Sequence, residues 1–251
     1  MSPHIEVAAE TIGTIFGFPI TNTLIMVWIT IVVLAVFSCV IYRGMSIVPG
    51  RLQNIFEILI ERFLGMMEGV FGTRDKAEKY FPVIATIFLL VLLSNWMGIL
   101  PGVGSIGLSV IGGEELHGEE RFVPLFRSTA SDLNFTLALA IISVFLTNIF
   151  GIAAIGFFKH VSKFISIKSP IDFFVGVLEL ISEIAKMISF SFRLFGNIFA
   201  GEVLLVIMAF LAPFLVPVPF LGLELFVGFV QALVFAMLTM VFISISVSHQ
   251  H

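Results

Sequence analysis

The sequence has few charges and almost no cysteine. Charged residues make up 12% of its 251 residues, against about 25% in soluble domains, whereas apolar residues make up 59%. Cys39 is the only cysteine, so an internal disulfide is excluded and the fold must rely on helix packing. No hydrophilic stretch is long enough to fold alone. The composition therefore predicts an integral membrane protein with a single domain over residues 1–251.

Several functional signatures are also missing. The net charge of −4 gives no support for nucleic-acid binding. No Rossmann glycine pattern, P-loop or metal-ligand cluster occurs in the sequence, so we expect no cofactor, no metal site and no catalysis by the chain alone. Residues 1–20 contain Glu6 and Glu10 but no basic residue, which is not typical of a cleaved signal peptide.

The sequence contains long apolar runs with few charged residues, and five of them are expected to cross a bilayer as helices. Residues 21–42 carry no charge and exceed the ~20 residues that a membrane helix needs. The four further spans are expected at residues 81–100, 133–158, 170–212 and 220–247. These spans predict an all-α membrane fold.

The fourth span is too long for an upright helix. At about 1.5 Å per residue, the run 170–212 would measure roughly 60 Å, about twice the hydrocarbon thickness of a bilayer. Pro213 and the prolines at 217 and 219 mark a turn after it. We therefore expect the last two helices to form a long tilted hairpin.

Three features between the spans have more than one explanation. Residues 51–71 place apolar and polar side chains at helical spacing, which predicts an amphipathic helix on the membrane surface, against a partner, or packed on the other helices. The segment 102–131 is rich in glycine and carries four glutamates, so we expect an exposed loop. Asn95 lies in the second span, where an amide more often links two helices than forms a site.

Basic residues predict the orientation. Residues 43–80 carry six and residues 159–168 carry three, whereas 102–131 has two and 1–20 has none. Basic loops stay in the cytoplasm. We therefore expect the N-terminus outside and the C-terminus in the cytoplasm.

Arg193 lies inside the apolar run 186–205, and a charge there requires an explanation. An arginine at the centre of a membrane helix costs about 2.5–3.5 kcal/mol, so it usually faces a protein interior or a wet path. Helical spacing places mostly polar and small residues near its face: Ser182, Lys186, Ser189, Asn197 and Ala200. The small residues beside it would let another helix backbone approach closely: Gly196, Ala200 and Gly201.

These residues carry a family resemblance. The segment RLFGNIFAGE at 193–202, with Gln231 in the following helix and NWMGILPG at 95–102, resembles subunit a of the F-type ATP synthases. That subunit is the ion-conducting stator that faces the rotating c-ring. The resemblance covers nearly the whole chain. It implies a proton-translocating subunit of the bacterial inner membrane, with the c-ring, the peripheral-stalk b subunits and membrane lipid as partners and nucleotide chemistry in other subunits.

The resemblance also implies two offset half-channels separated by Arg193, which would face a c-subunit carboxylate. The residues that would line the periplasmic half-channel are Asn197, Glu202, Glu224 and Gln231. The family places Arg193 near Gln231 and Glu202 near Glu224, and both pairings centre the hairpin at 212–213. Many bacterial relatives have histidine at the position of Glu224. All five histidines of this chain lie outside the apolar spans, so conduction should not require imidazole.

Two roles stay open for two further groups of residues. Asp132 opens the third span, where it is either a helix cap or, by resemblance, a residue near the entrance of the periplasmic channel. Glu179, Glu183 and Lys186 share one helix surface. They form either an intrahelical ion-pair ladder or, with Ser182 and Ser189, the wall of a cytoplasmic exit path.

Two other kinds of function compete with the stator subunit. A secondary transporter with a central charged substrate site usually shows internal repeats, and the Arg193 motif has no second copy. If the chain were a membrane assembly protein that conducts no ions, nothing would explain the ionisable residues Arg193, Glu202 and Glu224 inside its apolar spans. We therefore prefer the proton-translocating subunit.

Overall fold

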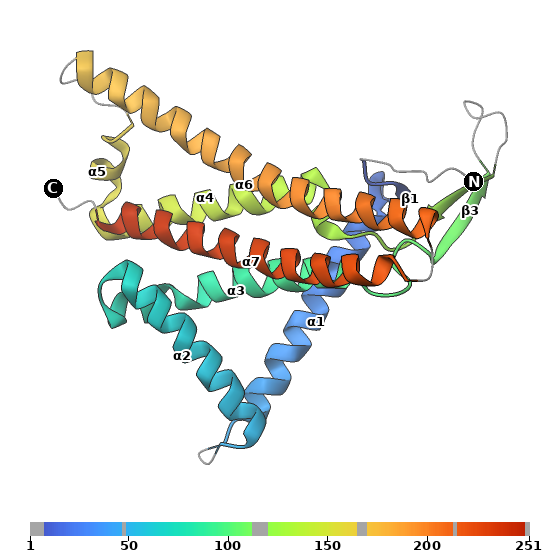
Figure 1. Cartoon of the computed structure of the whole chain (residues 1–251). Coiled ribbons are helices and arrows are strands. Elements are labelled where there is room, and N and C mark those ends of the chain that lie inside the picture. Colours follow the sequence, from blue (N-terminus) through green and yellow to red (C-terminus); the bar gives the residue numbers. More distant parts are fainter. Residues whose placement is uncertain (1–7, 47–48, 112–119, 165–169, 213–214, 249–251) are drawn as a thin grey trace. The chain divides into compact units, whose positions relative to one another are not determined.

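The computed structural model describes residues 8–46, 49–111, 120–164, 170–212 and 215–248 (Figure 1). Several residues used in the sequence predictions lie outside this set: Glu6, Glu114, Glu115, Glu119, Lys168 and Pro213. The side chains of Leu52, Ser109–Ile111, Glu120, Arg121 and Pro170 are likewise not described.

Five described helices are long and apolar enough to cross a membrane, which confirms the prediction of an all-α membrane protein. They are α1 (Asn22–Gly44), α3 (Arg74–Gly98), α4 (Leu133–Ile155), α6 (Pro170–Leu211) and α7 (Pro217–Ser248). α6 has 42 residues and therefore an axial length of about 60 Å. α3 begins seven residues before the predicted span, because its charged first turns continue the helix beyond the apolar run.

The amphipathic helix α2 (Arg51–Phe71) has the predicted bounds. It ends at Gly72, whose φ of 76° is a left-handed conformation that favours glycine. The side chains of Leu64, Met67 and Phe71 pack in one buried cluster with residues of α3 and α7. Ile55, Ile58 and Leu59, in the first half of α2, are exposed. Packing on the chain's own helices therefore explains the second half of the apolar face, and a surface or partner role stays a prediction for the first half.

The described part of 102–131 contains two strands and a short helix where a loop was expected, and its residues 127–131 are buried and not exposed as predicted. Strand β3 (Gly107–Ile111) pairs antiparallel with β4 (Glu120–Pro124), and a short 3-10 helix, η2 (Thr129–Ser131), follows. A second hairpin precedes α1 and joins β1 (Thr11–Ile15) to β2 (Phe18–Thr21). Both are short two-stranded hairpins. Glycine is disfavoured in strands, so the glycine-rich composition of 102–131 did not predict the hairpin in this segment.

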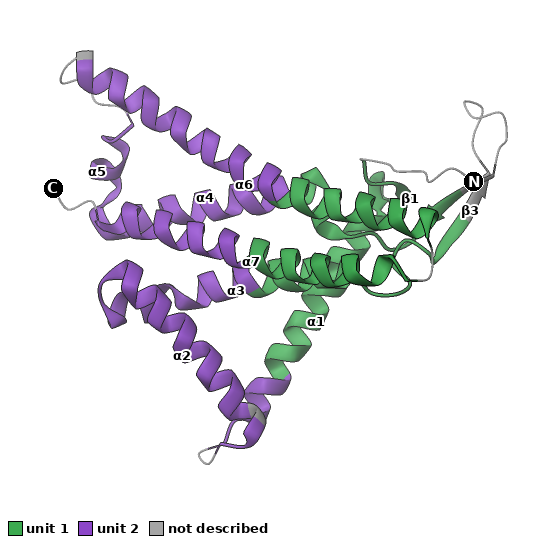
Figure 2. Ribbon diagram, in the orientation of Figure 1, with its two compact units in different colours: residues 1–39, 89–135, 194–232 green, residues 40–88, 136–193, 233–251 purple. Residues whose placement is uncertain are grey.

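The described chain divides into two compact units (Figure 2). Unit 1 contains residues 1–39, 89–135 and 194–232, and unit 2 contains 40–88, 136–193 and 233–251. Each of the five long helices contributes residues to both units. The single domain 1–251 therefore stays a proposal.

Polar contacts join the helices within each unit. In unit 1, Asn95 of α3 donates to the carbonyl oxygen of Gly228 in α7 over 2.8 Å, so Asn95 links two helices as predicted. In unit 2, the hydroxyls of Ser143 and Thr239 are 2.8 Å apart and link α4 to α7. Inside an apolar environment, such bonds add specificity to helix packing that apolar contacts alone do not give.

Candidate functional site

The polar and small stripe predicted on α6 lies on its exposed surface. Arg193 is exposed, and its Nη2 is 3.4 Å from Oγ of Ser189, one turn earlier. Ser182, Asn197 and Ala200 are also exposed, whereas Lys186 is half-buried. The opposite face of α6 is buried at Phe190, Leu194 and Ile198.

The exposed face of α6 has no side chain at Gly196. Apart from its own stretch of helix, a Cβ atom at Gly196 would have no atom of the described residues within 4 Å. Arg193 is the last residue of α6 in unit 2, and Leu194 is the first in unit 1. A charged group on an otherwise small, exposed helix face within a membrane is a surface suited to another helix and not to lipid.

Glu202 and Glu224 come together within unit 1, as predicted. A Cβ atom at Gly201 would lie 3.4 Å from Oε1 of Glu224, so the glycine next to Glu202 lets the Glu224 carboxyl approach the α6 backbone. Glu224 is buried and Glu202 half-buried, and the two carboxyl groups interact electrostatically. Among the described residues, neither Oε2 of Glu202 nor Oε2 of Glu224 has a hydrogen-bond partner. Two neighbouring acidic groups in a buried region are typical of sites that bind and release protons.

Gln231 lies seven residues after Glu224 on α7 and is half-buried, so both residues lie near one helix face. Gln231 belongs to unit 1 and Arg193 to unit 2. The predicted proximity of these two residues therefore stays a prediction.

Asp132 lies directly before α4 and caps its start. Its Oδ1 accepts a hydrogen bond from the backbone N–H of Asn134 over 2.9 Å, and its Oδ2 accepts one from Oγ1 of Thr23. The side chain is buried. The cap interpretation is confirmed, and the entrance role remains a proposal.

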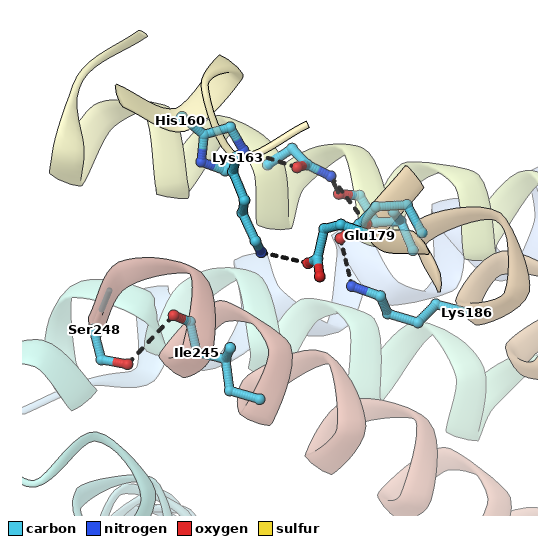
Figure 3. Close-up of polar contacts among 9 residues, drawn as sticks. His160, Lys163, Glu179, Lys186, Ile245 and Ser248 are labelled. Carbon is cyan, nitrogen blue, oxygen red and sulfur yellow. Dashed lines mark hydrogen bonds and ion pairs between the residues drawn. The ribbon is translucent and has the colours of Figure 1, made fainter. Parts of the chain in front are cut away.

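The predicted ion-pair ladder on α6 is confirmed for one pair only. Lys186 pairs with Glu183, three residues earlier. Glu179 instead pairs with Lys163, which lies outside α6 (Figure 3). The first part of α6 is therefore tied to the segment that follows α5 (Phe157–Val161).

The sequence patterns did not indicate two residues near Glu183. One contacts Glu183 directly, and the other contacts the first. Asn148 of α4 donates to Oε2 of Glu183 over 3.3 Å, and His160 of α5 lies 3.0 Å from Oδ1 of Asn148. An amide inside an apolar span was a usable signal for Asn148. His160 follows three exposed residues of α5, Phe157 to Lys159, and no sequence pattern indicated that its ring is buried.

His160 is 3% exposed, and its surroundings disfavour the charged imidazolium. Burial lowers the pKa of His160 below its ordinary value, and the nearby Lys163 ammonium lowers this pKa further. The Glu183 carboxylate acts in the opposite direction. These surroundings therefore favour the neutral imidazole over the imidazolium.

Comparisons with known proteins agree on one family. The profile of the ATP synthase A chain family matches residues 24–244. ATP synthase subunit a 3 of Pelobacter propionicus is 34% identical over 226 residues, which cover 89% of this chain and 86% of the relative. ATP synthase subunit a of Campylobacter hominis is 33% identical over 233 residues, 92% of each chain. ATP synthase subunit a of Helicobacter pylori strain Shi470 is 36% identical over 217 residues, 86% of this chain and 85% of the relative.

Proposed function

This chain belongs to the ATP synthase A chain family, and we propose that it is the stator subunit that passes protons to and from a rotating c-ring through two offset half-channels. The observation that carries the proposal is the exposed face around Arg193. It combines a permanent charge with small residues inside an apolar helix. Such a face requires a partner within the membrane.

Arg193 is proposed to separate the half-channels. A guanidinium favours the ionised form of a carboxylate brought close to it, so it promotes proton release from a c subunit on one side. Its permanent positive charge also opposes direct hopping of protons from one half-channel to the other. Protons would then have to travel with the rotating ring.

The periplasmic half-channel is proposed to include the acidic pair Glu202 and Glu224, together with Asn197 and Gln231. The pair supports this role because the Glu224 carboxyl lies against Gly201, the residue before Glu202, in a partly buried region of unit 1. Asp132 is proposed to lie beside the entrance, where its two hydrogen bonds hold the starts of α1 and α4.

The cytoplasmic exit path is proposed to follow the first half of α6. The polar residues there are Glu179, Ser182, Glu183, Lys186 and Ser189. In this arrangement the N-terminus is periplasmic and the C-terminus cytoplasmic, in agreement with the distribution of basic residues. Besides the c-ring, the expected partners are peripheral-stalk b subunits and lipid, and the chain itself is non-catalytic and needs no cofactor.

Reconstitution of the complete ATP synthase in vesicles tests this function. An imposed proton gradient should drive ATP synthesis at the same rate with and without sodium, and omission of this chain should abolish it. A rate that depends on sodium would contradict proton coupling. Uptake of a small solute by the chain alone, without the c-ring, would favour a secondary transporter.

A further inference from the structure

A chain of polar side chains from three helices ends on the carboxylate of Glu183. The Glu183 side chain is 8% exposed. Its Oε2 accepts a hydrogen bond from Nδ2 of Asn148, and its Oε1 pairs with Lys186. Behind Asn148 lies His160, whose Nε2 is 3.0 Å from Oδ1 of the amide. Each carboxylate oxygen therefore has a donor, and His160 contacts the donor that comes from α4.

The contacts of Asn148 determine how its amide is oriented. Its Nδ2 lies 2.9 Å from the carbonyl oxygen of Val144 and 3.3 Å from Oε2 of Glu183. A carbonyl and a carboxylate can only accept, so the NH₂ group must face them. Oδ1 therefore faces His160, and Nε2 of His160 must carry a hydrogen to donate. The neutral ring is then the Nε2–H tautomer.

The imidazole ring is held firmly in this position. A Cβ atom at Gly151 of α4 would lie 2.7 Å from Cε1 and 2.9 Å from Nδ1 of His160, so the ring packs directly against the α4 backbone. The Phe164 ring meets it edge to face, with 5.7 Å between centroids. Among the described residues, the buried Nδ1 has no hydrogen-bond partner, so the packing and the bond to Asn148 fix the ring.

We propose that His160 and Asn148 are positioning residues, which hold the carboxylate of Glu183 in one orientation beside Lys186 for proton exchange on the cytoplasmic side. This inference rests on the exit path proposed above. Without the Nε2–H donor of His160, Oδ1 of Asn148 would lose its donor, and only the hydrogen bonds of the NH₂ group to Val144 and Glu183 would hold the amide. Without Asn148, only the flexible Lys186 side chain would orient Glu183. A carboxylate with one donor on each oxygen keeps acceptor capacity for an incoming proton.

The test uses the assembled ATP synthase in inverted vesicles, whose outer solution bathes the cytoplasmic face. ATP-driven proton pumping is measured from pH 6 to 9, and the rate is divided by the amount of assembled complex. Asn148→Leu and His160→Leu should each lower the rate about three- to tenfold, the factor expected for loss of one hydrogen bond. They should also move the midpoint of the pH profile by about half a unit. His160→Gln, which keeps an N–H donor, should restore most of the rate.

A neighbouring residue provides the control. Thr147 is buried, and its Oγ1 donates to the carbonyl oxygen of Ser143 in its own helix, so Thr147→Val should leave the pH profile unchanged. If His160 acts through Asn148, His160→Leu should cause no further loss in an Asn148→Leu background. Should Asn148→Leu fail to assemble, Asn148→Ser replaces it, because the shorter side chain also loses the bond to Glu183.

Two results separate this inference from the proposed function. A normal rate in Glu183→Gln would show that Glu183 is not on the proton path, which would overturn the exit path itself. Glu183→Gln could instead lower the rate while the Asn148 and His160 variants leave the midpoint of the pH profile unchanged or leave the rate itself unchanged. In that case the exit path stands and only the positioning role is wrong.

Discussion

Thr23 donates a hydrogen bond from its Oγ1 to Oδ2 of Asp132 over 2.9 Å, and this bond joins the starts of α1 and α4, 109 residues apart in the sequence. The other oxygen of Asp132 caps α4. One buried carboxylate thus joins the starts of two helices, both of which lie in unit 1, at the end where a proton entrance is proposed.

We predict that Asp132 supports the entrance wall and does not itself carry protons. An asparagine has one acceptor oxygen, and its NH₂ group keeps the contact with Thr23 only if the direction of that bond is reversed, so Asp132→Asn should destabilise the chain by about 1 kcal/mol. Thr23→Val removes one of the same bonds and leaves the charge in place. Both variants should keep proton flux within about twofold of the wild type when the rate is divided by the amount of assembled complex. A much slower flux in Asp132→Asn alone would show that the carboxylate takes part in conduction.

For Arg193, we predict that neither lysine nor alanine supports coupled ATP synthesis. Lysine keeps a charge but lacks the planar fork and the permanently protonated state of arginine. The two variants should differ in leak, because Arg193→Ala removes the positive charge that opposes direct hopping. Passive proton conductance should therefore persist or rise in Arg193→Ala, measured in vesicles stripped of the catalytic head.

ATP-driven pumping with the head in place completes the Arg193 experiment. Both variants should fail to pump. Normal pumping by Arg193→Ala would mean that Arg193 does not separate the half-channels, and normal pumping by Arg193→Lys would favour an ordinary ion pair.

Glu224 is predicted to work as a titratable group of the periplasmic half-channel. Glu224→Gln keeps the shape but cannot bind and release a proton, so flux should fall at least about tenfold while the complex assembles. Glu224→His should retain substantial activity, because imidazole titrates near physiological pH. Proton-driven ATP synthesis in vesicles provides the measurement. If both variants prevent assembly, the role of Glu224 is structural.

The orientation predicted from the basic residues can be tested with an impermeant thiol reagent. In a Cys39→Ser background, Ser105→Cys and Ser162→Cys introduce single thiols at exposed positions. We expect Ser105→Cys to be labelled only from the periplasmic side and Ser162→Cys only from the cytoplasmic side. Labelling of both from one side would contradict the topology.

Gly151 is predicted to tolerate no side chain. A Cβ atom there would lie 2.1 Å from Oγ of Ser246 and 2.7 Å from Cε1 of His160, so Gly151→Ala must displace both side chains. The expected cost is about 1–3 kcal/mol. Thermal unfolding in detergent should show it, and a second change, Ser246→Ala, should recover part of the loss by removing the nearer atom. Equal stability of Gly151→Ala and the wild type would contradict this packing.

The sequence by itself determined the membrane class, the five long helices and the stripe that includes Arg193. Each of these properties depends on residues of the same segment of the sequence. Whether a segment enters a bilayer depends on the summed hydrophobicity of its own residues, and the residues that share a helix face follow from the helical repeat. The bounds of α2 could therefore be predicted, and those of the long helices to within a few residues, except that α3 begins seven residues before its predicted span.

Only the tertiary structure decided three contacts between polar side chains that neither spacing nor resemblance had indicated. Thr23 with Asp132, Asn148 with Glu183, and His160 with Asn148 are pairs of residues from different helices or their ends. Their contacts depend on helix rotation, on close approaches such as that at Gly151, and on side-chain length. Apolar residues pack against many neighbours with similar energy, whereas a hydrogen bond requires one partner at one distance and direction. For that reason hydropathy and spacing could predict the helices but not the group that holds Glu183.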